Sequence, residues 1–360
     1  MIGTKPRSLQ DGFSLIELMT ALVLGLILTG GAIQIFISSK ATYRTEAALA
    51  RIQETGRFIV DYMAREVRMA GYTGCSSRGN ITPNIIANNP PPLALNNANA
   101  LLGYNVTGVD TWSPGIPASI QFGLQGINGD GIADSDVINI MRADECGATV
   151  VGNWDVTNAN VQVAYPNTCG FEQHRPVIIS DCVNTDIFQI VSNPNASGNK
   201  QTLTHSNSGN TGNFLAQNYG PDSQISVPRS NSFFIAPGTS GEPALYMASW
   251  HTNDDDDTVD TDDFDIMELA DGVEDLQILY GEDTGGGDLY ADSYVAASAV
   301  TDWSAVRSVR IMLLLRSDDR VTEEPRAITF NGAVVNSGAG ADRRLRMVYI
   351  STVTVRNRLP

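Results

Sequence analysis

The sequence predicts an α+β fold in which one long N-terminal helix, with its first half in a membrane, packs on a globular domain of mainly antiparallel β-sheet. Three observations predict this fold. Residues 13–37 form an apolar run with a single charge, Glu17. A helical, amphipathic pattern continues from that run to about Ala70. Most of the remaining chain consists of short segments of alternating apolar and polar residues separated by Gly, Pro and Asn, which is typical of antiparallel strands.

The apolar run at residues 13–37 is long enough to cross a membrane. A helix rises about 1.5 Å per residue, so the run reaches about 37 Å, whereas the core of a bilayer is about 30 Å thick. A buried core helix is one alternative, but core helices seldom stay apolar on every face for this length. A secretory signal peptide is another, but its apolar region is about 7–15 residues long and precedes a small-residue cleavage site. Ser38-Ser39-Lys40 offers no such site.

The helix is expected to continue through residues 38–72. Apolar or small residues recur there at spacings of three, four or seven, and most charged residues fall on the other faces, so one stripe is available for burial. Gly56 weakens this helix without ending it. We expect the helix to end at Gly71 or Gly74, because glycine readily takes the left-handed conformation found at helix C-termini.

Residues 73–360 are predicted to form a β-rich domain with long loops. Residues 76–117 and 192–213 are expected to be loops, because Asn, Pro, Gly and Ser dominate them. Strands are predicted at residues 118–124, 135–141, 161–164, 176–179, 186–191, 224–227, 232–235, 244–248, 303–316 and 345–356. Residues 266–280 are predicted to form a strand, a turn or short helix, and a second strand, and residues 303–316 a central strand.

The charge of the chain is unevenly distributed. Its formal net charge is −17, yet residues 1–70 carry a net charge of +2 and the rest carries −19. This acidic domain argues against a nucleic-acid partner, because binding to phosphate backbones needs a basic surface. The short leader contains Lys5 and Arg7, so we expect it to remain in the cytoplasm and the domain to be exported.

The four cysteines are Cys75, Cys146, Cys169 and Cys182. An even number in an exported domain predicts two disulfides, and three connectivities are possible. Free structural thiols are the alternative. The spacing does not fit a zinc site, because no Cys-x-x-Cys motif occurs.

No catalytic motif is found in the sequence, which therefore predicts no enzyme and no cofactor other than a possible calcium ion. Two loops have acidic residues near the spacing that calcium requires. The first contains Asn128, Asp130, Asp134 and Asp136, and the second contains Asp283, Asp288 and Asp292. The alternative for each is a polar turn between two strands.

The segment Gly12-Phe13-Ser14-Leu15-Ile16-Glu17, between a short basic leader and the apolar run, resembles the class III signal of type IV prepilins and pseudopilins. The resemblance implies that a prepilin peptidase removes residues 1–12 by cleaving after Gly12 and then methylates the amino group of Phe13. It also implies that the helix stays in inner-membrane lipid until the subunit enters a filament.

Glu17 fits this resemblance physically. A carboxylate in hydrocarbon costs several kcal/mol unless it is neutralised or paired, so an acid inside a membrane segment indicates a functional contact. The resemblance implies that Glu17 meets the N-terminal amine of a neighbouring subunit during assembly. The alternative is that Glu17 lies at the membrane interface and is solvated.

Four segments towards the ends of the chain resemble the PilW-type minor pilin family. They are residues 69–75, residues 272–281, Asp302-Trp303 with the Val-Arg run that follows, and the terminal Thr-Val-Arg-Asn-Arg. The resemblance implies a pilin-like fold and a structural role in priming type IV pilus assembly at or near the pilus tip. It implies other minor pilins, a tip adhesin and the major pilin as partners, and places the chain first in the inner membrane, with its domain in the periplasm, and then in the extracellular pilus.

Three alternatives remain at this point. Residues 273–277 (Val-Glu-Asp-Leu-Gln), followed by a Trp and a Val-Arg strand, also resemble the J-type minor pseudopilin of type II secretion. A membrane-anchored, calcium-dependent binding module is the second alternative. An anchored periplasmic enzyme is the third, and it would need a pocket of convergent polar groups that the sequence does not indicate.

Overall fold

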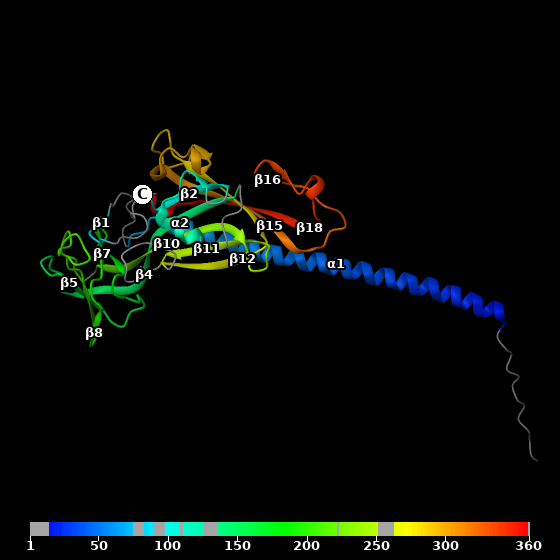
Figure 1. Cartoon of the computed structure of the whole chain (residues 1–360), viewed down its shortest axis with the longest axis horizontal. Coiled ribbons are helices and arrows are strands. Elements are labelled where there is room, and N and C mark those ends of the chain that lie inside the picture. Colours follow the sequence, from blue (N-terminus) through cyan, green and yellow to red (C-terminus); the bar gives the residue numbers. More distant parts are fainter. Residues whose placement is uncertain are drawn as a thin grey trace, which may run out of the picture.

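The computed structural model describes residues 14–74, 83–88, 98–108, 111–125, 135–221, 223–250 and 263–358. A long helix, α1, runs along one side of a β-rich domain, and its N-terminal half projects beyond that domain (Figure 1). The predicted α+β fold is confirmed. The helices and strands are α1 (Leu15–Met69), β1 (Asn84–Ile85), β2 (Leu101–Gly108), β3 (Thr111–Ser113), α2 (Ala118–Gln125), β4 (Asp136–Gly152), β5 (Asn160–Ala164), β6 (Pro176–Ser180), β7 (Thr185–Gln189), β8 (Asn195–Ser197), β9 (Lys200–Thr204), β10 (Gln224–Pro237), β11 (Pro243–Trp250), β12 (Phe264–Asp271), β13 (Val273–Glu282), β14 (Ser293–Val295), β15 (Val306–Arg320), β16 (Ile328–Phe330), β17 (Ala333–Val335) and β18 (Arg344–Thr354).

Helix α1 is a single helix of 55 residues, as the sequence predicts. Ser14 caps its N-terminus, and Gly71 follows its C-terminal end with a φ of 75°. A side chain would be strained in that left-handed conformation, so the helix ends where glycine permits the chain to turn. Among the described residues, α1 is the one helix long and apolar enough to cross a membrane.

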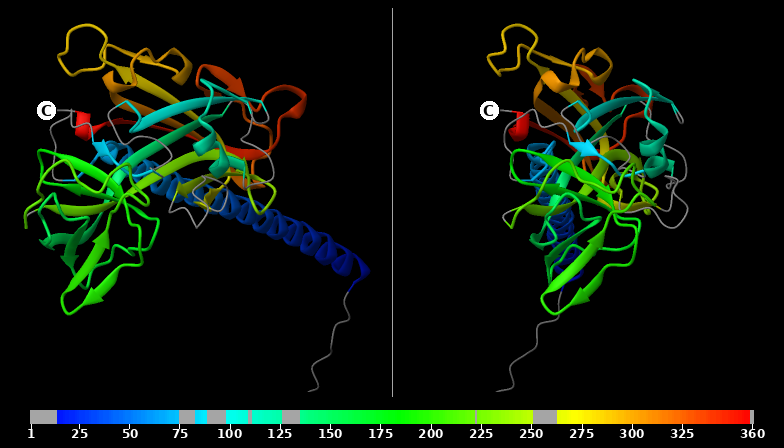
Figure 2. Two further views of the ribbon diagram at one scale, coloured as in Figure 1. Left: turned by 60° about the vertical axis from the view of Figure 1, so that its left-hand side comes forward. Right: turned by 90° about the vertical axis from the view of Figure 1, so that its left-hand side faces the viewer.

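Two strands organise the larger sheet, which has 12 strands. Strands β4 and β10 pair along most of their length, from Thr149 opposite Gln224 to Ile138 opposite Phe233. The N-terminal half of β10 also pairs with β6, and its C-terminal half pairs with β11. Strand β4 in turn pairs with β2 near its start and with β5 near its end. The two long strands therefore run from the part of the domain beside α1 into a distal lobe (Figure 2).

The smaller sheet has four strands in the order β14-β13-β15-β18 and carries α1 on one face. Strand β15 is central, as predicted, and β18 follows it at the edge. Buried residues of α1, such as Ile59 and Met63, share one core with Leu276, Ile311 and Val353 of this sheet. A hydrophobic helix stripe and the facing side of a sheet thus bury each other, which is the main source of stability for this pair of layers.

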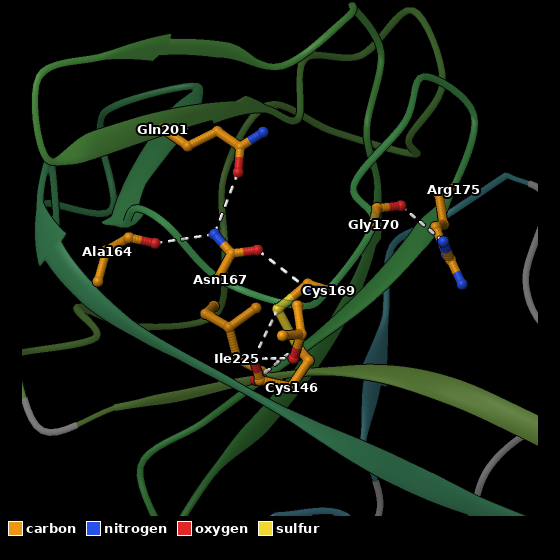
Figure 3. The surroundings of a disulfide bond; sticks show 9 residues. Cys146, Ala164, Asn167, Cys169, Gly170, Arg175, Gln201 and Ile225 are labelled. Atoms are coloured by element: carbon orange, nitrogen blue, oxygen red, sulfur yellow. Dashed lines mark hydrogen bonds between the residues drawn. A yellow bond between two sulfur atoms is a disulfide. The ribbon is translucent and has the colours of Figure 1, made fainter.

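The distal lobe has its own core. This lobe comprises β5–β9, the far ends of β4 and β10, and the loops between them. The side chains of Val163, Phe188, Leu203 and Tyr219 are almost fully buried there. A disulfide between Cys146 at the end region of β4 and Cys169 in a loop crosses this core (Figure 3).

The structure corrects the prediction of a strand at residues 118–124, which lie in helix α2. Alternating apolar residues suggested a strand, but Ile120 and Leu124 are also spaced as neighbours on one helical face, and both are buried. The carbonyl of Pro117 accepts hydrogen bonds from the backbone N–H groups of Ile120 and Gln121 and so starts the helical turn.

Two predicted loops contain strands. Residues 76–117 include β1, β2 and β3, and residues 192–213 include the hairpin of β8 and β9. Leu101 and Leu203 in these segments are fully buried. Local composition is polar in both segments, but pairing with β4 and β5 places a few apolar side chains in the core and thereby overrides the local tendency to form a loop.

Candidate assembly surface

The apolar half of α1 is an exposed surface. Every large apolar side chain between Leu15 and Ile37 is at least 54% exposed. A Cβ atom added at Gly25, Gly30 or Gly31 would meet no atom within 4 Å. So large an apolar surface is unfavourable in water, and it has to be covered by lipid or by other helices. Small residues on it permit close approach of a second helix.

Glu17 is part of the helix cap. The backbone N–H of Ser14 donates a hydrogen bond to Glu17 Oε2 at 3.0 Å, and the backbone N–H of Ile16 donates to Ser14 Oγ at 3.3 Å. This reciprocal arrangement satisfies two backbone donors at the start of α1 and places a carboxylate where the helix dipole favours negative charge. Gly12 and Phe13, the predicted processing residues, lie outside the described residues.

The second half of α1 is fixed to the domain by close packing. Gly56 lies directly against the ring of Tyr349 on β18, so closely that a Cβ atom at this position would overlap the ring. The hydroxyl of Tyr349 donates to the carbonyl oxygen of Ile52 at 3.5 Å. At the C-terminal end of α1, the Asn357 amide donates to the carbonyl oxygen of Ala70 at 3.2 Å. The helix therefore packs against β18 at Ile52 and Gly56, and contacts the residues after β18 at its C-terminal end.

A buried ion pair joins α1 to the larger sheet. Glu66, 4% exposed, accepts hydrogen bonds from Arg142 Nε at 3.1 Å and Arg142 Nη2 at 3.2 Å. The side-chain amide of Asn231 donates to the same carboxylate at 2.9 Å. The pKa of Arg142 is raised: burial lowers it, but hydrogen bonds and charge interactions with Glu66 and Asp144 outweigh that effect. We call Glu66, Arg142 and Asn231 the helix clasp.

Sequence reasoning did not find the helix clasp, although a signal for it was present. Glu66 sits beside Met63 and Val67 in the buried stripe of α1, where an acid is out of place unless it has a partner. The partners, Arg142 on β4 and Asn231 on β10, lie far away in the chain and are brought to Glu66 only by the tertiary fold.

The described residues of the two predicted calcium loops do not converge on a common metal site. Asp283 Oδ2 lies 3.4 Å from the Nε of Arg307, and Asp292 accepts a hydrogen bond from the backbone N–H of Thr284 at 2.8 Å. Asp288 accepts from the backbone N–H of Tyr290. Among the residues that the structure describes, no three metal-binding side chains meet. Asn128, Asp130 and Asp134 of the first loop lie outside the described residues.

Asp136 is instead part of a buried connection between the two sheets. Its Oδ2 accepts a hydrogen bond from the backbone N–H of Ile278 on β13 at 2.7 Å, and its neighbour Ser135 accepts from the N–H of Leu276 at 3.1 Å. Asn105 on β2 donates to the other carboxylate oxygen. Burial raises the pKa of Asp136 to about 7, against the lowering effect of these hydrogen bonds. This carboxyl group thus titrates near neutral pH.

Two of the four cysteines form a disulfide in the distal lobe. The disulfide joins Cys146 and Cys169, which are 23 residues apart in the sequence. Asn167 supports the loop around it by donating to the Ala164 carbonyl oxygen at 2.8 Å and accepting from the N–H of Cys169 at 3.1 Å (Figure 3). Cys182 is also disulfide-bonded, and Cys75 lies outside the described residues.

A groove runs along α1 on the side of β12 and the end of β15. Its volume is about 530 Å³, and Tyr43, Phe58 and Leu269 contribute apolar lining. A salt bridge between Arg51 and Asp318, 2.6 Å long, lies among its lining residues. Both partners are well exposed, so the pair adds little stability.

Comparisons with known proteins found two family models that match segments of this chain. The family model for the type IV pilus-assembly protein W matches residues 232–357, which span the end of β10, the smaller sheet and the residues after β18. The model for the prokaryotic N-terminal methylation motif matches residues 7–33, which include the beginning of α1. No curated protein and no solved structure matches the chain significantly. Domains of these two kinds are structural, and the motif and the apolar helix together indicate membrane anchoring. Both features in one chain support a type IV pilus-related pilin that is similar to minor pilins of the PilW type.

Proposed function

We propose that this chain primes assembly of a type IV pilus and is located at or near the pilus tip. In this proposal a prepilin peptidase cleaves after Gly12, Phe13 becomes the methylated N-terminus, and Glu17 contacts the terminal amine of a neighbouring subunit. The domain lies in the periplasm before assembly and outside the cell afterwards. Its neighbours are other minor pilins, the major pilin and a tip adhesin.

The observation that carries this proposal is the continuity of α1. Its exposed apolar half and its clasped second half form one uninterrupted helix of 55 residues. Lipid can cover the apolar half before assembly, and neighbouring helices can cover it afterwards, so the same surface serves both states. Because the second half is fixed to the domain, movement of the helix out of the membrane carries the whole domain with it.

Substitution of Gly12 tests the processing step. We expect Gly12→Leu to accumulate as a precursor that begins at Met1 and to be missing from sheared filaments. Gly3→Leu is the matched control, because it makes the same change nine residues earlier in the leader. Normal processing and normal recovery of Gly12→Leu in filaments would contradict the proposal.

Substitution of Glu17 tests the assembly contact separately from processing. We expect Glu17→Ala to be cleaved like the wild type but to enter filaments poorly, because the neighbour's amine loses its anionic partner. Glu54→Ala is the control, since Glu54 is an exposed acid in the second half of the same helix. Equal recovery of both variants in filaments would favour a merely solvated Glu17.

A further inference from the structure

Strand β18 leaves one long edge of the smaller sheet open. It pairs with β15 on one side, and no described strand pairs with its other side. The N–H of Val355 donates to the carbonyl oxygen of Arg307. Val355 and every second residue before it in β18 therefore direct their backbone groups towards β15. Because backbone groups alternate between the two edges of a strand, the N–H and C=O groups of Val348, Ile350, Thr352 and Thr354 point outward. These four residues define the outer edge of β18.

This edge lacks the features that usually prevent strands from pairing. Natural edges are protected by charged residues, proline, bulges or shortness. Residues 347–354 contain no charge, no proline and no glycine, and the register shift in β18 lies before them. Ile350 is 63% exposed. The segment is therefore a ready template for an added strand.

The other open edges among the described residues are protected. Strands β1, β3, β8 and β14 have only two or three residues each. Strand β12 is longer, but it carries Asp265, Glu268 and Asp271 and lies next to a register shift. The outer edge of β18 thus differs from the edges of these five strands, which argues that it serves for contact.

The position of this edge indicates what can reach it. Tyr349 contacts α1 at Ile52, and Asn357 contacts α1 at Ala70, so β18 runs alongside α1 and away from the membrane. Ile52 is about 22 Å above the end of the apolar run at Ile37, which is beyond the lipid head groups. A second subunit anchored by the same kind of membrane helix, standing parallel to α1, would present its own domain at this height.

The charges at the ends of β18 restrict the chemistry of that partner. Arg343 and Arg356 are exposed and flank the uncharged run on either side. A complementary segment has an extended, uncharged stretch of about eight residues with acidic residues at its ends.

We propose that the outer edge of β18 binds an extended, acid-flanked strand of a neighbouring pilus subunit, which extends the four-stranded sheet across the subunit boundary. This proposal rests on the proposed function, because it takes the neighbour to be a subunit of the same filament. Backbone hydrogen bonds supply the affinity, and the flanking arginines set the register.

A proline at Thr352 tests the pairing. The N–H of Thr352 points outward, so Thr352→Pro removes a donor from the open edge and leaves the ladder with β15 intact. Thr352→Ala is the matched control: both variants lose the contact between the Thr352 hydroxyl and Arg310, but alanine keeps the backbone N–H. In cells that assemble pili, we expect full-length Thr352→Pro to be recovered in sheared filaments about tenfold less than wild type, and Thr352→Ala to be recovered normally.

Hydrogen exchange gives a second measurement that does not depend on the variant folding. The backbone N–H groups of Val348, Ile350, Thr352 and Thr354 are expected to exchange fast in the detergent-solubilised wild-type chain and slowly in filaments. Normal recovery of Thr352→Pro in filaments, or equal exchange in the two states, would overturn the strand-pairing proposal. Failure of the proposed function has a different signature, a wild-type chain that still begins at Met1 and is absent from filaments, and it would overturn this proposal as well.

Discussion

The carboxylate of Glu66 accepts two hydrogen bonds from the guanidinium of Arg142, at 3.1 and 3.2 Å, across the contact between α1 and β4. Glu66 is 4% exposed, so the pair is shielded from water and Asn231 completes its hydrogen bonding. Removing Glu66 leaves the buried charge of Arg142 with the more exposed Asp144 as its acidic partner, so much of its compensation is lost. The helix that enters the membrane is therefore attached to the domain by a specific electrostatic contact in addition to apolar packing.

This relationship predicts a large loss of stability for Glu66→Ala. We expect the free energy of unfolding to fall by about 3 kcal/mol, because Arg142 would stay buried without its main partner. Chemical denaturation of the full chain in detergent, followed by circular dichroism, measures this change. The exposed Glu54→Ala on the same helix is the control and should change the free energy of unfolding by less than about 0.5 kcal/mol. Similar values for the two variants would show that the clasp contributes nothing specific.

The position of Gly56 against Tyr349 predicts that alanine at this position destabilises the protein, although alanine favours a helix more than glycine does. Alanine normally stabilises a helix relative to glycine by about 1 kcal/mol, but here its Cβ would overlap the ring of Tyr349. We expect Gly56→Ala to lower the free energy of unfolding by about 1–3 kcal/mol. In a Tyr349→Ala background the ring is absent, and the same substitution should become stabilising. A double-mutant cycle on the four chains checks the change of sign, and equal effects in both backgrounds would contradict it.

The buried Asp136 is expected to make a contribution to the free energy of unfolding that decreases as the pH rises. Burial raises its folded pKa to about 7 from an ordinary value of 3.8, so the folded protein binds the proton more tightly than the unfolded chain. The contribution is complete below about pH 4 and is lost as the pH rises through about 7. Asparagine does not titrate, so Asp136→Asn lacks this loss. The unfolding free energy of the variant minus that of the wild type should therefore rise by a few kcal/mol between pH 4 and pH 8. A difference that stays constant over this range would refute the assignment.

Removal of the disulfide is expected to speed hydrogen exchange in the distal lobe. Cys146 and Cys169 close a loop across 23 residues, and opening such a loop typically costs about 3 kcal/mol through the entropy of the unfolded chain. In the Cys146→Ser, Cys169→Ser double variant, hydrogen exchange should accelerate in β5, β6 and β9 but not around Glu66. Uniform acceleration over the whole domain would instead indicate one cooperative unit.

Much of the fold could be predicted from local patterns. The apolar run and its amphipathic continuation predicted α1 through Met69, and the alternation in residues 345–356 predicted β18. Periodicity is reliable in the second half of α1 and in β18 because one face of each packs against the core over many residues. Strand β10 shows the limit: Pro228 and the polar residues after it suggested two short strands, yet the ladder with β4 continues across them.

The remainder depends on contacts between residues far apart in the chain. Whether residues 118–124 form a strand or a helix is undecided locally, because Ile120 and Leu124 satisfy both periods. The partners of Glu66 and the burial of Asp136 arise only when the two sheets meet. For the assembly surface, the sequence motif predicted Glu17 as the key residue of the helix start, while the clasp and the open edge of β18 required the three-dimensional structure.

The most direct test of the account is the intact mass of the chain extracted from membranes and from sheared filaments. We expect both to lack residues 1–12 and to carry one methyl group on Phe13, with α1 retained. A chain that begins at Met1 would show that the helix is an ordinary anchor, and a chain that begins after Ile37 would show that it is a discarded export signal. Either result would contradict the role in pilus assembly.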